Sequence, residues 1–153
     1  MERVELKTES NLVLESNRQT ALRNLGAALQ SPEETTLREH QTSMMQALYD
    51  FLLGGDTAGY MSEPTGTGKS AVMVKIAEAM GLKTVILSPM QQILNQTAKE
   101  ARKFAPDLSI SNYYSGEKDL SGTVINTTYQ SIPTLLRARH SNFNPQNIQL
   151  VLC

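Results

Sequence analysis

Residues 59–74 read GYMSEPTGTGKSAVMV, and this stretch decides how the rest of the chain is interpreted. Its middle, EPTGTGKS, matches the pattern G-x-x-x-x-G-K-[ST] from Gly68 onward and departs from it at the first position, where Glu63 stands. Such a pattern forms a glycine-rich phosphate-binding loop when a strand precedes it and a helix follows it. TAGYMS predicts a strand over 57–62, and KSAVMVKIAEAM predicts a helix over 69–80. The sequence therefore supplies the context that this loop needs.

Each residue that matches the loop pattern has a chemical reason to stand there. Gly66 and Gly68 allow backbone angles that a Cβ disfavours, so successive N–H groups of the loop turn toward phosphate oxygens. The following helix adds the positive end of its dipole. Lys69 brings a full positive charge to the β- and γ-phosphates, and the Ser70 hydroxyl is a hard oxygen ligand for Mg²⁺. The predicted nucleotide site comprises Pro64, Thr65, Gly66, Thr67, Gly68, Lys69 and Ser70, with Lys69 as the catalytic residue and Ser70 as the magnesium ligand. The alternative to a phosphate-binding loop is a simple glycine turn between a strand and a helix, with Lys69 as an ordinary surface lysine.

Glu63 is the residue that departs from the loop pattern. A carboxylate that faced a triphosphate would repel it. The first position of the pattern lies at the end of the strand, before the N–H groups converge, and Pro64 fixes a backbone dihedral beside it. We therefore expect the Glu63 side chain to point away from the phosphates, toward solvent or a neighbouring cation.

Length and composition set outer bounds on the protein class. The chain has 153 residues, which corresponds to one domain or part of a larger one. Its net charge of −1 gives no general attraction to nucleic acid or membrane, so a polyanion binder would need a local basic patch. The single cysteine, Cys153, excludes an internal disulfide framework and a thiolate metal cluster. No apolar run suggests a membrane span, and the polar start MERVELKTES does not resemble a secretory signal. We expect a cytoplasmic location, or a nuclear one in a eukaryotic cell.

Strands and helices alternate after the glycine loop. The segments that predict strands are TVILS at 84–88, LSISNYY at 108–114, GTVINTT at 122–128 and IQLVLC at 148–153. Helices are predicted over 90–104 and over 129–140, the second with Pro133 in its first turn. This alternation predicts an α/β fold in which helices cover both faces of a mostly parallel sheet.

The first 35 residues look like a separate N-terminal extension of unknown role. VELK and NLVLE predict short strands, and 17–30 predict a helix whose apolar face carries Ala21, Leu22, Leu25 and Leu29. SPEETT then marks a boundary, so we expect the main domain to cover 36–153.

The helix that opens the main domain has two candidate starts. Thr36 and Glu39 have the spacing of a capping box, and Gly54-Gly55 stops the apolar face that follows. SPEE offers a rival start one turn earlier, through Ser31, Pro32 and Glu34. The later start is preferred.

Several segments together resemble the first motor domain of superfamily 2 helicases, the DEAD/DEAH-like group of ATP-driven translocases. LREHQ, residues 37–41, is similar to the adenine-recognition segment that lies upstream of the loop in that family. The resemblance implies that Arg38 and Gln41 contact the base of ATP or its surroundings, and an amide can both donate to and accept from an adenine edge. Taken alone, Gln41 would be interpreted as a solvent-facing glutamine in the first turns of a helix.

Two later segments resemble helicase elements that touch the nucleic-acid backbone. LSPMQQILNQ, residues 87–96, is similar to motif Ia, and NTTYQSI, residues 126–132, is similar to a later backbone-contacting element. The resemblance implies nucleic-acid contacts at Ser88, Gln96, Thr127, Thr128 and Gln130. The alternatives are an ordinary strand-to-helix turn at the first segment and a helix start capped by Thr128 at the second. The basic residues Lys99, Arg102, Lys103, Arg137 and Arg139 are interpreted as solvated surface.

The resemblance covers about 36–153 and implies an incomplete RecA-like P-loop NTPase domain with ATP and Mg²⁺ as cofactors and DNA or RNA as partner. In the family an Asp-Glu pair follows directly after a strand like IQLVLC, and the sequence stops at Cys153, before such a pair. We therefore expect a truncated motor that binds ATP without hydrolysing it. The motor subunit of a restriction enzyme or a remodeller fits the same segments. A P-loop kinase and a non-catalytic nucleotide-binding module stay open as alternatives, although a kinase leaves LREHQ unexplained.

Overall fold

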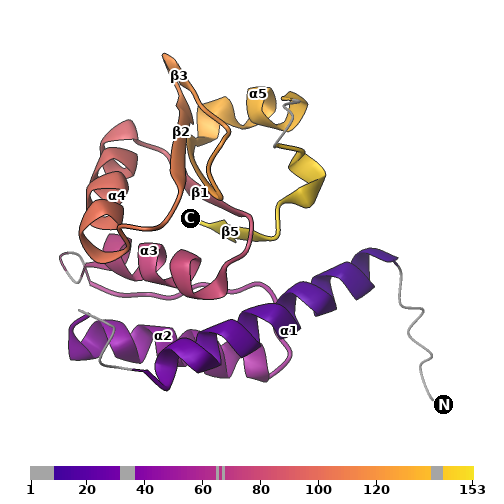
Figure 1. The fold of residues 1–153 in the computed structure, drawn as a ribbon, viewed down its shortest axis with the longest axis vertical. Coiled ribbons are helices and arrows are strands. Elements are labelled where there is room, and N and C mark those ends of the chain that lie inside the picture. The colour runs from indigo at the N-terminus through magenta and orange to yellow at the C-terminus, as the bar shows by residue number, and fades with distance from the viewer. Residues whose placement is uncertain (1–8, 32–36, 65, 67, 139–142) are drawn as a thin grey trace.

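A computed structural model describes residues 9–31, 37–64, 66, 68–138 and 143–153. Five strands form one sheet in the order β3-β2-β4-β1-β5 (Figure 1). The strands are β1 (Thr84–Ser88), β2 (Ile110–Tyr114), β3 (Glu117–Lys118), β4 (Val124–Thr128) and β5 (Leu150–Leu152). β1 pairs in parallel with β4 and β5, β2 pairs in parallel with β4, and the short β3 pairs antiparallel with β2. The predicted α/β class with a mostly parallel sheet is confirmed.

Both faces of the sheet are covered by helices (Figure 1). Successive strand residues point to opposite faces, so neighbours in sequence join different cores. Ile86 of β1 and Val124 of β4 pack on the side of α3 (Lys69–Met80) and α4 (Gln91–Phe104). The adjacent residues Val85 and Ile125 pack on the opposite side, where α5 (Ile132–Arg137) contributes Leu135.

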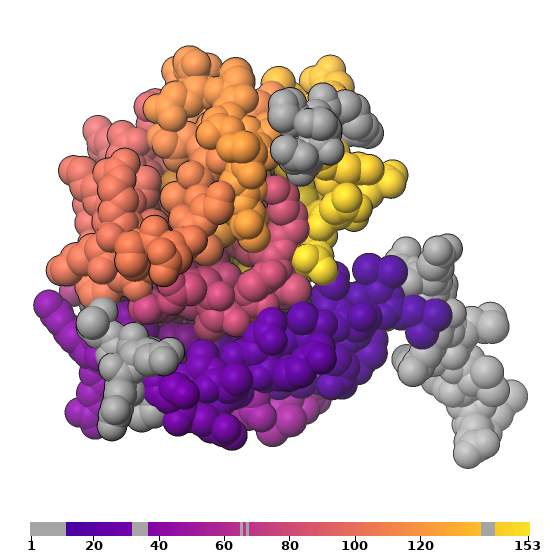
Figure 2. Space-filling model, viewed as in Figure 1, coloured from indigo at the N-terminus to yellow at the C-terminus, as the bar shows by residue number. Residues whose placement is uncertain are grey.

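The first two helices, α1 (Glu9–Leu29) and α2 (Glu39–Leu53), form a further layer against α3 (Figures 1 and 2). Their shared core contains Ala21, Leu22, Leu25, Met44, Met45, Leu52, Val72, Ile76 and Met80. α1 also binds the carboxyl ends of both other helices. The Arg18 guanidinium donates to the Leu52 carbonyl at 2.6 Å, and the Asn24 amide donates to the Met80 carbonyl at 2.7 Å. The Met80 carbonyl is one that a helix end leaves without an internal donor, whereas the Leu52 carbonyl also accepts from the Gly55 N–H at 3.1 Å.

The structure differs from the prediction at two places near the start of the chain. NLVLE lies inside α1 and is not a strand, while VELK lies outside the described residues. A helix satisfies its backbone hydrogen bonds internally, whereas an isolated strand has no partner for them. α2 begins at Glu39, after both predicted starts, because Gln41 fills the third helical position of a capping box and its side-chain oxygen accepts from the Arg38 N–H at 2.9 Å. Thr36 itself lies outside the described residues.

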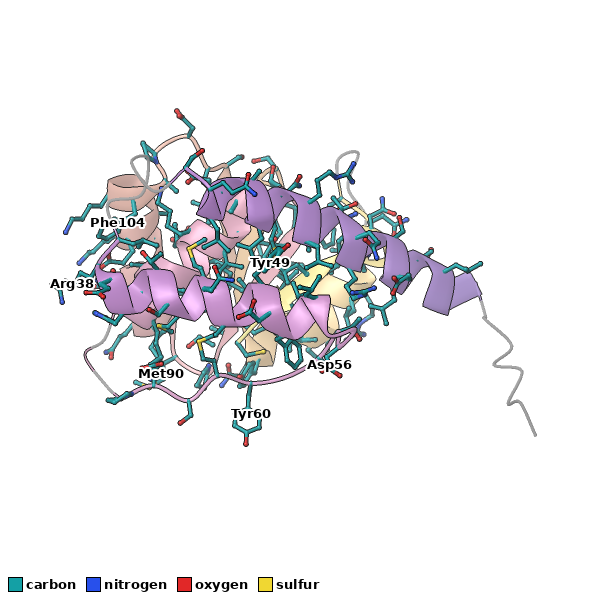
Figure 3. All side chains as sticks on the ribbon, turned by 90° about the horizontal axis from the view of Figure 1, so that it is seen from below. Arg38, Tyr49, Asp56, Tyr60, Met90 and Phe104 are labelled. Atoms are coloured by element: carbon teal, nitrogen blue, oxygen red, sulfur yellow. The ribbon has the colours of Figure 1, made fainter. Side chains whose placement is uncertain are left out.

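The strand predicted over 57–62 is wrong. These residues have an irregular backbone, and Tyr60 projects into solvent with 96% of its surface exposed (Figure 3). A largely apolar hollow of about 770 Å³ is lined by this segment, by α3 and by β5. The segment therefore borders open space instead of a neighbouring strand, and a strand needs a neighbour to pair its backbone.

The other predicted elements are present, most of them with shifted ends. α3 ends at Met80, as predicted, before Gly81 with its left-handed φ of 62°, whereas α4 begins at Gln91, one residue later than predicted. The helix predicted over 129–140 consists of a 3₁₀ turn, Tyr129–Ser131, followed by α5, with Pro133 in its first turn. β3 was not predicted, because its two residues are too few to show a pattern. No helix among the described residues combines the length and apolar character that a membrane crossing requires.

Candidate nucleotide-binding site

The glycine loop ends where α3 begins. Gly68 is the residue before the helix, and both it and Gly66 have φ of 81°, which is left-handed backbone. Side chains with a Cβ rarely adopt this conformation, so the two glycines are required by the backbone shape. Lys69 and Ser70 are the first two residues of α3, with Lys69 exposed and Ser70 half-buried.

Lys69 is folded back over the start of the loop. Its ammonium donates a 2.6 Å hydrogen bond to the backbone carbonyl of Glu63. This contact uses an atom that every residue type possesses, so the side chain at position 63 is not needed for it. The direction of the Glu63 side chain stays a prediction. Pro64 is exposed, and the predicted site residues Thr65 and Thr67 lie outside the described residues.

Gln41 lies directly against the loop and is only 5% exposed. Its amide nitrogen donates to the Gly68 carbonyl at 3.2 Å, while its amide oxygen accepts from the Arg38 N–H. The interpretation of Gln41 as a solvent-facing residue is therefore wrong. Arg38, the other residue expected near the base, is exposed at the start of α2 (Figure 3).

The residues expected to touch nucleic acid divide into buried hydroxyls and exposed amides. Ser88 and Thr128 end β1 and β4 as register partners, so the structure brings them together. Both are buried, and Thr127 is fully buried with its hydroxyl donating to the Tyr113 carbonyl at 2.6 Å. The Ser88 hydroxyl accepts from the Met90 N–H at 3.3 Å, so each of the three hydroxyls has a partner within the fold. Their contact with nucleic acid stays a prediction.

The two amides lie on the surface. Gln96 is exposed on α4 and donates to the Glu100 carboxylate at 2.6 Å, and Gln130 is exposed in the 3₁₀ turn after β4. Thr128 directly precedes that turn and its hydroxyl lies 3.0 Å from the Ser131 hydroxyl, in keeping with a capped helix start.

A polar network under α4 was missed from the sequence. The Tyr114 hydroxyl donates to the Asn95 side chain at 2.8 Å, and the Asn126 amide donates to the Leu94 carbonyl at 3.1 Å. Burial, with a smaller contribution from Glu117, raises the pKa of Tyr114. The sequence does carry a signal for this network, because residues two positions apart on a strand lie on the same face of the sheet. This spacing relates Asn112 to Tyr114 on β2 and Val124 to Asn126 on β4. The network fixes the first turns of α4 on the sheet.

No cluster of three or more acidic, histidine or cysteine side chains that could hold a metal occurs in the described part of the chain. The assignment of Ser70 to Mg²⁺ stays a prediction.

Comparisons with known proteins agree with this architecture. The family model described as "Type III restriction enzyme, res subunit" matches residues 34–153. The chain is also similar to UvrABC system protein B of Thermus thermophilus, with 29% identity over 109 residues, which is 66% of this chain and 16% of that protein. It thus spans about a sixth of the length of this relative. The chain belongs to the type III restriction enzyme res subunit family, and it carries an N-terminal RecA-like part of a superfamily 2 helicase motor.

Proposed function

We propose that this chain is the ATP-binding part of a nucleic-acid-dependent ATPase. The observation that supports this most directly is the pair of left-handed glycines, Gly66 and Gly68, in front of α3. This backbone presents N–H groups and a helix N-terminus to an anion, and a Cβ at either position would be strained. A triphosphate therefore fits the residues that form the loop.

In this proposal each side chain of the loop has one task. Lys69 leaves the Glu63 carbonyl and binds the β- and γ-phosphates, because a phosphate offers a full negative charge where the carbonyl offers only a dipole. Ser70 gives a hydroxyl to Mg²⁺, which when bound neutralises phosphate charge. Pro64, Thr65 and Thr67 complete the loop. Arg38, exposed at the start of α2, and Gln41, one turn further along the same helix, lie beside the base.

We propose that the chain as given binds ATP without hydrolysing it. Phosphoryl transfer to water needs a group that positions the attacking water, and none of the residues assigned here to the nucleotide is an acid. Gln96 and Gln130 contact a DNA or RNA backbone, with Ser88, Thr127 and Thr128 supporting the strand ends behind them. We place the activity in the cytoplasm, or in the nucleus of a eukaryotic cell. The family match favours the motor subunit of a restriction enzyme over the other motors considered.

Titration calorimetry with Mg²⁺ and ATP tests the proposal. The unmodified chain should bind ATP, and Lys69→Ala should weaken binding at least about tenfold, because a charge-assisted bond worth roughly 1.5–3 kcal/mol is lost. Lys99→Ala removes another exposed lysine, on α4, and should bind like the unmodified chain. Equal affinity in the two variants would show that the loop does not hold the phosphates, and rapid phosphate release by this chain would contradict the absence of hydrolysis.

A further inference from the structure

We propose that a cleft between α1 and residues 144–149, the segment that leads into β5, binds a small oxyanion with the chemistry of a carboxylate or a phosphate group. This ligand is independent of the proposed nucleotide. The two elements lie side by side, and the Gln149 amide of the segment donates to the Asn17 side chain of α1 (Figure 2). The cleft has a volume of about 410 Å³, which is within the range of small-molecule sites. Its lining includes Lys83 and five carboxamide side chains, those of Asn17, Asn144, Gln146, Asn147 and Gln149.

The cleft lies at the opposite end of the sheet from the glycine loop. Lys83 directly precedes β1 and Gln149 directly precedes β5, so the cleft is at the amino ends of two parallel strands. The glycine loop leads into the first residue of α3, and this helix ends at Met80, close to Lys83 in sequence. A rise of about 1.5 Å per residue gives the 12 residues of α3 a length of about 18 Å. The cleft is therefore a site separate from the phosphate loop.

Hydrogen bonds inside the cleft use amide oxygens and leave amide nitrogens for a ligand. The Asn17 oxygen accepts from the Gln149 side chain at 3.1 Å, and the Asn144 oxygen accepts from the Gln146 N–H at 3.0 Å. A carboxamide also carries an NH₂ group with two donors. Within the described residues, no hydrogen bond engages the NH₂ groups of Asn17 and Asn144. Free donors of this kind select a ligand whose oxygen atoms are acceptors.

The charge of the cleft favours an anion. Among the described residues that line it there is a lysine but no aspartate or glutamate. The Lys83 ammonium donates to the Gly122 carbonyl at 2.5 Å and lies 5.5 Å from the centre of the Phe143 ring, and no carboxylate of the described chain pairs with it. Burial lowers the pKa of Lys83, because its positive charge loses water without gaining a negative partner. An oxyanion in the cleft would supply that negative charge.

Nuclear magnetic resonance of the isotope-labelled chain tests the proposal, because the NH₂ groups of Asn17 and Asn144 give signals of their own. Inorganic phosphate, sodium acetate and sodium chloride are compared at equal ionic strength. Lys69→Ala serves as the background, so that phosphate held by the glycine loop does not contribute. We expect both signals to shift saturably with phosphate or acetate, with a Kd on the order of 1 mM for so small a ligand, and not with chloride. The probe that binds more tightly identifies the oxyanion group that the cleft prefers.

Asn17→Asp and Asn144→Asp remove the donor but keep the acceptor that the fold uses. In each variant a carboxylate oxygen still accepts the present hydrogen bond, while a negative charge stands where the NH₂ group was. We expect each variant to bind the tighter probe at least about tenfold more weakly, with the signal of the remaining asparagine as the readout. Asn95→Asp is the matched control, because it adds the same charge on α4 and keeps an acceptor for the Tyr114 hydroxyl. It should leave the affinity unchanged.

Three results would overturn the proposal. Equal shifts with chloride and with the two oxyanions would indicate a general effect of salt. The absence of a saturable shift with either oxyanion would show that the cleft does not bind this class of ligand. Equal losses of affinity in Asn17→Asp and Asn95→Asp would mean that net charge, and not the NH₂ donors of the cleft, governs binding.

Discussion

At Glu63 the chain contributes its backbone to the loop, because the Lys69 ammonium binds the carbonyl and not the carboxylate. We therefore expect Glu63→Ala to change ATP affinity by no more than about fivefold, the effect of a solvent-screened charge worth up to roughly 1 kcal/mol. Calorimetry with Mg²⁺ and ATP measures this. A gain of an order of magnitude in Glu63→Ala would show that the carboxylate faces the nucleotide.

Gly66 and Gly68 form a matched pair for separating backbone strain from steric contact. Both have φ of 81°, but a Cβ on Gly66 meets nothing within 4 Å, whereas a Cβ on Gly68 collides with Gln41. Alanine at Gly66 should lower the free energy of unfolding by about 1–2 kcal/mol, the cost of left-handed backbone. Alanine at Gly68 should lower it further, as measured by urea unfolding; equal losses would mean that the Gln41 contact relaxes freely.

At the scale of elements, α1 is an internal support of the fold. Leu25 on α1 is 0% exposed in the core shared with α2 and α3, whereas Leu12 on the same helix is 53% exposed. Leu25→Ala should lower the free energy of unfolding by about 2–5 kcal/mol, because a buried cavity forms. Leu12→Ala should change it by less than about 0.5 kcal/mol, as is usual for surface substitutions. Similar urea midpoints for the two variants would show that α1 does not stabilise the domain.

Elements with a strong local pattern could be predicted from the sequence, and those that depend on distant partners could not. The helix KSAVMVKIAEAM and its stop at Gly81 follow from periodicity and a left-handed cap, so their limits are correct. The strand predicted over 57–62 is wrong because a strand needs a neighbouring strand to pair its backbone, and the sequence of this segment does not show whether one is present. The contact of Gln41 with the Gly68 carbonyl joins residues 27 positions apart in sequence, and no local pattern shows that contact.

For the whole molecule, the sheet has one well-covered centre and one open side. β4 and β1 lie in the middle of the order β3-β2-β4-β1-β5, while β5 lies at one end beside the apolar hollow of about 770 Å³. The hollow reaches from β5 to α3, the helix that begins at the glycine loop. The same open side thus borders both the edge strand and the helix that supports the nucleotide site.

An edge strand with an exposed apolar residue is a site of self-association, since its backbone offers unpaired hydrogen-bonding groups to another chain. Val151 on β5 is 52% exposed, and we expect the protein to associate reversibly through this edge as its concentration rises. Val151→Lys should shift the sedimentation coefficient toward the monomer, because a lysine on an edge disfavours strand pairing. Leu136→Lys is the control: Leu136 is also 52% exposed but lies on α5, and both variants raise the net charge from −1 to 0. An equal effect of the two substitutions in sedimentation velocity would mean that charge, and not the β5 edge, governs association.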